Sequence, residues 1–404
     1  MTTSWTRMPS RRRGRRDRGM NILEVVGLVI VSVMVIVGVG AALGVPLPSG
    51  LATAVCNVTG GNNCDEIGTP TAAPVPSGTS TPCEAFCPGP DNPMVPTDPT
   101  VAATKGNYVA LGDSYSSGEG AVDYDDKSKE NGCHRSANAY SQHIGSDFEF
   151  QGDKSFVACS GAVTDDFFNK QKADENPQLT DSNLSDKTTL VTLSIGGNDL
   201  GFADVITKCA TDLHISWPPW EKKQDQCHAQ EGNIRQKMKE LFGPPEPSKY
   251  TKTLEAVHKE AKNARIIVTG YPQLFPTPPE HNWQNFKKED QEFLNKIGAE
   301  VNEKIRERVE ALDRKYYGHG EQKMGSFEFV DPSPSFKGHE ASNLPWDDPW
   351  IHPIWVNCQD GSANWEDKCV NPGSFHPTAE GQKAMADVIN KQIRNGPGRT
   401  LYDP

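Results

Sequence analysis

The sequence predicts an α/β fold, in which helices cover both faces of a doubly wound parallel sheet. Short apolar runs bounded by turn residues alternate with longer amphipathic stretches between Asn107 and about Arg394. Such alternation is typical of parallel sheets, because each strand reaches the next through a crossover that is usually helical. Roughly 290 residues are enough for one hydrophobic core, and the sequence contains no internal repeat.

The apolar runs and the amphipathic stretches give the expected elements in chain order. Strands are predicted at Tyr108–Leu111, Phe156–Ala158, Leu190–Ile195, Ile266–Thr269 and Phe327–Val330. Helices are predicted at Tyr250–Ala264, Lys287–Lys315 and Ala379–Arg394. In the second helix the apolar residues recur mostly every four positions: Phe293, Ile297, Val301, Ile305, Val309 and Leu312. This spacing predicts that the helix buries one face against the core.

The N-terminus combines a basic head with an uncharged apolar segment. The chain has 404 residues and a formal net charge of −12, but its first 20 residues carry a net +6. The rest of the chain therefore has a formal net charge of −18, and this negative charge disfavours nucleic acid as a partner. The 19 residues from Val25 to Leu43 lack charge and exceed the apolar core of a cleavable signal. We expect a single-pass membrane anchor with its N-terminus inside and the rest of the chain outside.

The junction between the head and the apolar segment has a second interpretation. Arg18-Gly19-Met20-Asn21-Ile22-Leu23-Glu24 resembles the leader junction of type IV pilin-like proteins. The resemblance implies cleavage after Gly19, which would release the chain from its leader, and a plain signal anchor is the alternative. It also implies a rival function, in which a pilin-like surface subunit carries a non-catalytic binding head.

Composition divides the chain into five segments. Residues 46–105 are rich in Pro, Gly, Thr and Ser, and such a segment buries too little apolar surface to fold by itself. The expected organisation is a cytoplasmic leader (1–20), an anchor helix (21–45), an extracellular linker (46–105), a main domain (106–396) and a tail (397–404).

All ten cysteines lie beyond the apolar segment. An even number in an exported chain indicates disulfides. A metal site is not expected, because the sequence lacks Cys-x-x-Cys and paired-histidine spacing. Two tryptophan-rich excursions, at residues 210–230 and 333–371, either line an acyl pocket or pack their loops onto the domain.

Four segments carry the candidate chemistry, and each lies where a predicted strand ends or a helix begins. They are Gly112-Asp113-Ser114, Cys159-Ser160-Gly161-Ala162, Gly196-Gly197-Asn198-Asp199, and Ser374-Phe375-His376-Pro377 before the N-cap candidate Thr378. Open α/β sheets bind their ligands at this edge. A serine needs a base to become a nucleophile, and His376 can take the proton of Ser114. The backbone N–H groups of Ser114 and Gly161 and the amide of Asn198 can stabilise an oxyanion.

In this order the segments resemble the SGNH (GDSL) hydrolase family across residues 107–394, and its secreted actinomycete esterase and lipase branch in particular. The resemblance implies a flavodoxin-like three-layer fold, ester substrates and neither metal nor cofactor. The four functional residues of the family carry over as Ser114, Gly161, Asn198 and His376. It also implies three consecutive disulfides, Cys133–Cys159, Cys209–Cys227 and Cys358–Cys369. The acyl group is left open between acetate, a fatty acid and a polysaccharide ester, and so is the oligomeric state.

The sequence departs from the family at one position. An aspartate usually lies three residues before the catalytic histidine, and here that residue is Gly373. We expect the Gly373 carbonyl to accept the Nδ1–H of His376 in a Ser–His dyad, with Asp360 or Asp367 as alternative orienting acids. A second His-Pro pair, at His352, is a rival base, but no helix start holds it in place.

Overall fold

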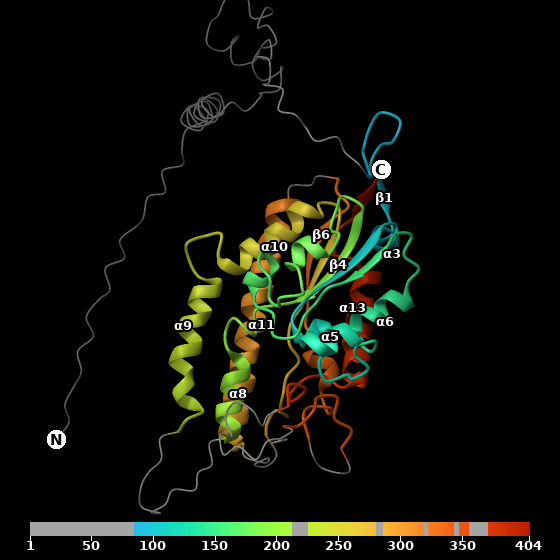
Figure 1. The fold of residues 1–404 in the computed structure, drawn as a ribbon. Coiled ribbons are helices and arrows are strands. Elements are labelled where there is room, and N and C mark those ends of the chain that lie inside the picture. The colour runs from blue at the N-terminus through green and yellow to red at the C-terminus, as the bar shows by residue number, and fades with distance from the viewer. Residues whose placement is uncertain (1–84, 212–224, 280–285, 319–321, 343–346, 355–370) are drawn as a thin grey trace, which may run out of the picture. The chain divides into compact units, whose positions relative to one another are not determined.

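A computed structural model describes residues 85–211, 225–279, 286–318, 322–342, 347–354 and 371–404 (Figure 1). They belong to one compact unit, Pro82–Pro404. The expected anchor, the Gly19 junction and most of the expected linker lie outside the described residues. Among the helices of the described part, none combines the length and hydropathy that crossing a bilayer requires.

Five parallel strands form the central sheet, as the sequence predicts. They are β2 (Asn107–Gly112), β3 (Lys154–Phe156), β4 (Thr188–Ser194), β5 (Arg265–Thr269) and β6 (Ser326–Val330). Their spatial order is β3-β2-β4-β5-β6, with parallel pairing throughout. This is the flavodoxin-like order 2-1-3-4-5, whose switch point lies between β2 and β4.

Helices cover both faces of the sheet (Figure 1). On one side lie α3 (Pro99–Thr104), α6 (Tyr140–Asp147) and α13 (Ala379–Asn395), and α13 contacts the other two. On the other lie α8 (Phe202–Thr211), α9 (Glu231–Phe242), α10 (Lys249–Glu260) and α11 (Lys288–Tyr317). The shorter helical elements are α4 (Ser114–Ser117), α5 (Asp126–Asn131), η2 (Thr164–Phe167), α7 (Gln178–Asp181), η3 (His228–Gln230) and η4 (Ser333–Phe336).

The long helix α11 confirms the predicted amphipathic stripe. All six apolar residues of that stripe are buried. Asp290 in its first turn accepts a hydrogen bond from the backbone N–H of Lys287 at 3.0 Å. Arg314 and Lys315 lie in the last turn, where positive charge interacts favourably with the helix dipole.

The structured unit begins earlier and ends later than the expected main domain. β1 (Val95–Thr97) and α3 lie within the expected linker, and β7 (Leu401–Asp403) lies within the expected tail. β1 and β7 pair antiparallel. Asp98 caps α3 by accepting hydrogen bonds from two backbone N–H groups, and α3 buries Ala102 and Ala103. The structured unit therefore extends beyond the positions 105 and 397 at which the expected main domain begins and ends.

Two of the three expected disulfides lie within the described residues. Cys133 pairs with Cys159, and Cys209 pairs with Cys227. Cys358 and Cys369 lie outside those residues. In the second excursion Trp350 stacks on His339 with ring centroids 3.7 Å apart, which supports the packing interpretation for that tryptophan.

Candidate active site

The nucleophile candidate lies directly after β2, at the carboxyl edge of the sheet. Gly112 ends β2 with φ +121°, and a Cβ there would lie 2.3 Å from the Ser194 carbonyl oxygen. Only glycine fits this close approach. Asp113 then caps α4 by accepting a hydrogen bond from Tyr115 N–H at 3.1 Å. Ser114 is consequently the first residue of α4 and is 6% exposed.

His376 meets Ser114 across 262 sequence positions, with Nε2 2.7 Å from the Ser114 Oγ. Thr378 caps α13, as predicted, by accepting the Gly381 N–H. Burial lowers the pKa of the His376 imidazole, although Glu119 and the Ser374 carbonyl partly oppose this. The histidine is therefore neutral at neutral pH, as a general base must be.

The orienting carbonyl was assigned to the wrong residue. Nδ1 of His376 lies 3.0 Å from the carbonyl oxygen of Ser374. The Gly373 carbonyl accepts the backbone N–H of His376 instead, at 3.2 Å, and so closes the turn before the histidine. In this turn the Gly373 carbonyl points at the backbone of His376, and the Ser374 carbonyl faces its ring. Asp360 and Asp367 lie outside the described residues.

Two of the three oxyanion-hole candidates, Gly161 and Asn198, lie on loops that are bonded to each other. Gly161 has φ +80°, and Asn198 Nδ2 donates to the carbonyl oxygen of Ala162 at 3.0 Å. Asp199 accepts hydrogen bonds from the N–H and the hydroxyl of Thr164, at 2.9 and 2.6 Å. Since an amide nitrogen carries two hydrogens, Asn198 keeps one donor besides the bond to Ala162.

Tyr271 joins two loops of the site, and the sequence analysis missed it. Its hydroxyl donates to Asp113 Oδ2 at 2.6 Å and accepts the Gly197 N–H at 2.9 Å, so it joins the loops after β2 and β4. Burial raises the pKa of Asp113 to about 6 despite hydrogen bonds from Ser194 and Tyr271. Tyr271 follows β5 by two positions, and this place at the carboxyl edge was the available signal.

His352, the rival base, holds the turn that carries His376. His352 Nε2 lies 2.8 Å from the Gly120 carbonyl oxygen. Its backbone N–H donates to the His376 carbonyl at 2.9 Å, and its carbonyl accepts the Phe375 N–H at 3.1 Å. Phe375 has φ +59°, a left-handed conformation that is unusual for an aromatic residue. The His352 segment thus fixes the turn that carries His376.

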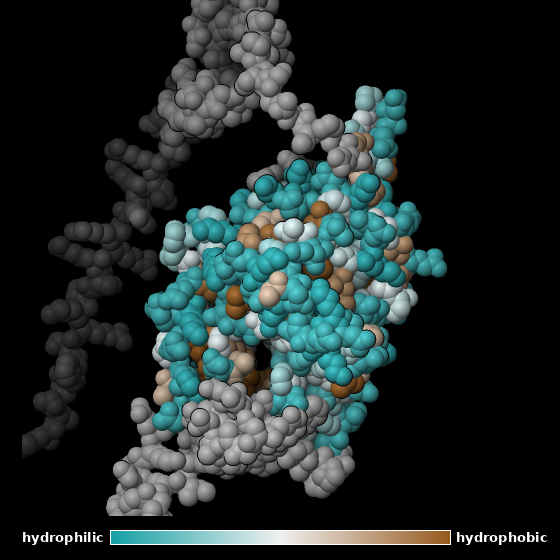
Figure 2. All heavy atoms as spheres, viewed as in Figure 1, coloured by the Kyte–Doolittle hydropathy of each residue, from teal (hydrophilic) through white to brown (hydrophobic). Residues whose placement is uncertain are grey.

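A cavity of about 740 Å³ opens onto Ser114, Asn198 and His376. Apolar residues of α8 and α11 form much of its wall, among them Phe202, Ile206, Leu294, Gly298 and Val301. Figure 2 shows a hollow in this mainly hydrophilic face, with apolar side chains at its edge. Gly161 is not among the residues that line the cavity.

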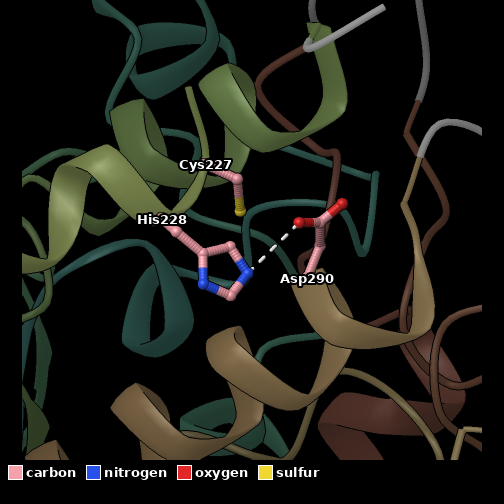
Figure 3. Close-up of side chains that lie close together, drawn as sticks. All are labelled: Cys227, His228 and Asp290. Atoms are coloured by element: carbon pink, nitrogen blue, oxygen red, sulfur yellow. Dashed lines mark ion pairs between the residues drawn. The ribbon is translucent and has the colours of Figure 1, made fainter. Parts of the chain in front are cut away.

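One cluster within the described residues has the side chains of a metal site. The ligand atoms of Cys227, His228 and Asp290 lie within 4.8 Å of one another (Figure 3). The sulfur of Cys227 is bonded to Cys209, and a metal needs the free thiolate. His228 Nε2 pairs with Asp290 Oδ1 at 3.5 Å, and its ring stacks on Phe293. The cluster therefore joins the start of α9 to α11.

A serine hydroxyl hydrogen-bonded to an imidazole on a flavodoxin-like sheet defines the class of α/β serine hydrolases. The model of the GDSL-like Lipase/Acylhydrolase family matches residues 110–384, and the chain belongs to this family. The protein is accordingly a carboxylic ester hydrolase.

Several proteins from Streptomyces species are similar to this chain in sequence or in structure. Lipase 1 of Streptomyces coelicolor is 32% identical over 286 residues, which cover 69% of this chain and 84% of that protein. A lipase of Streptomyces rimosus is 30% identical over 298 residues, covering 72% and 88%. The crystal structure of phospholipase A1 from Streptomyces albidoflavus is similar with a TM-score of 0.52 and 29% identity, covering 71% of this chain and 99% of that one.

Proposed function

We propose that the protein is an extracytoplasmic lipase or esterase that works through a Ser–His dyad. The 2.7 Å contact between Ser114 Oγ and His376 Nε2 carries this proposal. His376 removes the hydroxyl proton as Ser114 attacks the ester carbonyl, and the same imidazolium protonates the departing alcohol. Water, deprotonated by His376, then attacks the acyl-enzyme, which releases the acid and restores Ser114.

The other site residues stabilise charge that develops during these steps. The N–H groups of Ser114 and Gly161 and the side-chain amide of Asn198 donate to the oxyanion of each tetrahedral intermediate. The Ser374 carbonyl, 3.0 Å from Nδ1, selects the tautomer with Nε2 unprotonated. This chemistry uses only side chains and backbone groups.

Hydrolysis of p-nitrophenyl esters by the purified full-length chain tests the proposal. We expect turnover by the wild type and a loss of about 10⁴-fold or more in Ser114→Ala. Turnover by Ser114→Ala at the wild-type rate would contradict the assignment and favour the binding-head hypothesis.

The cavity points to the acyl chain as the part of the substrate that is enclosed. A Cβ at Gly298 on α11 would meet no atom within 4 Å, so Gly298→Leu places a side chain in the open space. The rate of hydrolysis of long-chain esters should fall about tenfold or more, because the acyl chain loses apolar contacts worth about 0.8 kcal/mol per methylene, while the rate for acetate esters is unaffected.

Gly232→Leu is the matched control, because Gly232 on α9 is also open and does not line the cavity. An equal loss on short and long esters would contradict the assignment.

The extracytoplasmic location rests on the sequence of the apolar segment and on the disulfides. We propose that the segment from Val25 to Leu43 holds the enzyme at the membrane with its catalytic unit outside, and that the linker gives this unit reach. Protease treatment of intact cells should release the catalytic unit. Protection of that unit until the cells are lysed would contradict the proposed topology.

A further inference from the structure

Glu119 is a buried carboxylate beside the active site that the steps above do not use. It is 2% exposed and lies just after α4. His134 donates through Nδ1 to its Oε2, and the Tyr124 hydroxyl donates to its Oε1 at 3.3 Å. Burial of an ionised group is costly unless the group is paired and hydrogen-bonded, so this carboxylate requires an explanation.

Glu119 and the next residue, Gly120, lie against three of the four segments that carry the candidate chemistry. Its backbone N–H donates to the Ser114 carbonyl at 3.0 Å. Ser160, the neighbour of Gly161, lies close enough to the carboxylate to lower its pKa. The next residue, Gly120, lies against His376, because a Cβ on Gly120 would be 3.0 Å from the His376 Cβ.

The partners of the carboxylate are themselves held in place. The rings of Tyr124 and His134 stack with centroids 4.6 Å apart, and the Tyr124 hydroxyl accepts the Gly120 N–H at 3.0 Å. His134 follows Cys133, whose disulfide to Cys159 ties this loop to the Ser160 loop. The position of the negative charge is consequently fixed before substrate binds.

The charges on this side of the site act on one another. Burial acts to raise the pKa of Glu119, but the hydrogen bond from His134 and the charges of His376 and His134 outweigh it, so the pKa is lowered and the group is ionised at neutral pH. In turn, Glu119 acts to raise the pKa of His376, whereas burial and the charge of His352 lower it. Among the side chains named as acting on the pKa of His376, Glu119 has the largest effect and His352 follows, and the carbonyls of Ser374 and Pro372 also act on it.

We propose that Glu119 is a positioning residue that supplies the fixed negative charge for the His376 imidazolium. In a Ser-His-Asp triad this charge comes from the aspartate bonded to Nδ1, whereas here a neutral carbonyl occupies that place. The inference rests on the proposed function, in which His376 is the base. Glu119 touches neither the substrate nor the reacting atoms, and it acts through His376 and through the Ser160 loop.

The pH dependence of kcat/KM in Glu119→Gln separates an electrostatic role from a structural one. The neutral amide keeps the shape of the side chain. Without the negative charge, the positively charged His376 ring is less stable. This loss is the same in the free enzyme with His376 protonated and in the transition state, because both contain the imidazolium. The pKa of the rising limb should therefore fall, and the plateau should fall by the same factor, about 3- to 10-fold for a shift of half to one unit. The rates of wild type and variant then converge at low pH. A purely structural loss lowers kcat/KM by one factor at every pH and would overturn the proposal.

A second readout does not need turnover. NMR titration of the His376 imidazole, assigned by the signal missing from His376→Asn, should give a lower pKa in Glu119→Gln than in the wild type. An unchanged pKa would overturn the proposal. If the pKa of His376 shifts in this way but the protein hydrolyses no ester, the proposed function is wrong, whereas the effect of Glu119 on His376 is still supported. The failure of one proposal can therefore be told from the failure of the other.

Three further variants complete the comparison. Glu119→Asp retains the charge, so its His376 pKa should stay closer to the wild-type value than that of Glu119→Gln. Glu119→Ser, which leaves room for water beside His134, takes the place of Glu119→Gln if the latter does not fold. Glu175→Gln is the matched control, because this buried carboxylate pairs with Arg135 and does not act on His376. It should leave the pH profile unchanged, and a shift as large as that of Glu119→Gln would overturn the specific role of Glu119.

Discussion

The two ends of the central sheet differ in their surroundings. At the amino end, the buried Arg265 donates all of its hydrogen bonds to protein acceptors. At the carboxyl end, residues in the left-handed backbone conformation and polar side chains surround an open cavity. The five N–H groups of Arg265 donate to both carboxylate oxygens of Glu328 and to the carbonyls of Pro99, Gln392 and Ile393. At the other end, Gly112, Gly196 and Phe375 have positive φ.

The difference teaches that stability and reactivity are carried by opposite ends of the same strands. The Arg265 cluster joins β5, β6, α3 and the end of α13, and all five N–H groups of the arginine are used within it. The catalytic end keeps Ser114 and His376 in contact beside space for a substrate. Substitutions at the two ends should therefore affect different measurements.

The largest effect is expected at the catalytic end. His376→Asn should lower kcat about 10⁴-fold and should cost only about 1–2 kcal/mol of unfolding free energy, because the ring makes two hydrogen bonds. Parallel ester assays and urea unfolding check both numbers. His352→Asn is the matched control and should keep at least about a tenth of the activity, since the bond from its ring to the Gly120 carbonyl is not part of the contact between Ser114 and His376. A greater loss in His352→Asn than in His376→Asn would reverse the assignment of the base.

The opposite pattern is expected at the amino end. Arg265→Met leaves Glu328 buried without its ion-pair partner, which should cost about 3–5 kcal/mol of unfolding free energy with kcat of the folded protein unchanged. Urea unfolding and assays well below the melting temperature measure the two quantities. Arg235→Met, which breaks a surface ion pair with Glu231, should cost less than about 1 kcal/mol. A selective loss of kcat in Arg265→Met would contradict the separation of the two ends.

A smaller effect is expected from one oxyanion donor. Asn198→Ala should lower kcat about 10²- to 10³-fold with little change in KM, because the donor acts chiefly on the developing oxyanion. Thr164→Val is the control, since it breaks a hydrogen bond to Asp199 that holds the same pair of loops without removing a donor to the oxyanion. Equal losses in the two variants would mean that Asn198 only holds the loops together.

The smallest effect concerns pH and the buried Asp113. Burial raises its folded pKa from 3.8 to about 6, so the native state binds more protons than the unfolded state between these values, and stability falls as pH rises through that window. Two pKa units correspond to about 3 kcal/mol, which is the upper bound. Relative to Asp113→Asn, the wild type should lose unfolding free energy between pH 4 and pH 7. Parallel pH dependence in both proteins would contradict this.

Some parts of this fold could be read from the sequence and others could not. Most strands were predicted from continuous apolar runs, because strands of a covered parallel sheet are buried on both faces, and α11 was predicted from apolar residues on one face. β3 (Lys154–Phe156) lies two residues before the expected strand Phe156–Ala158. β1 and β7 escaped detection, because each has three residues and lacks an alternating apolar pattern. Whether the Gly373 or the Ser374 carbonyl accepts the Nδ1–H of His376 depends on the conformation of the turn before His376. The residue types in this turn do not determine that conformation. Residues 262 positions apart, such as Ser114 and His376, were brought together by motif order and family resemblance, since spacing does not measure distance.

Labelling of the full-length chain with a fluorophosphonate tests the central claim most directly. The probe reacts with a serine hydroxyl that a neighbouring base has activated. We expect one equivalent of label, mapped by mass spectrometry to Ser114 in the wild type and lost in His376→Asn. Absence of label on the folded wild-type protein, or label on another serine, would contradict the account.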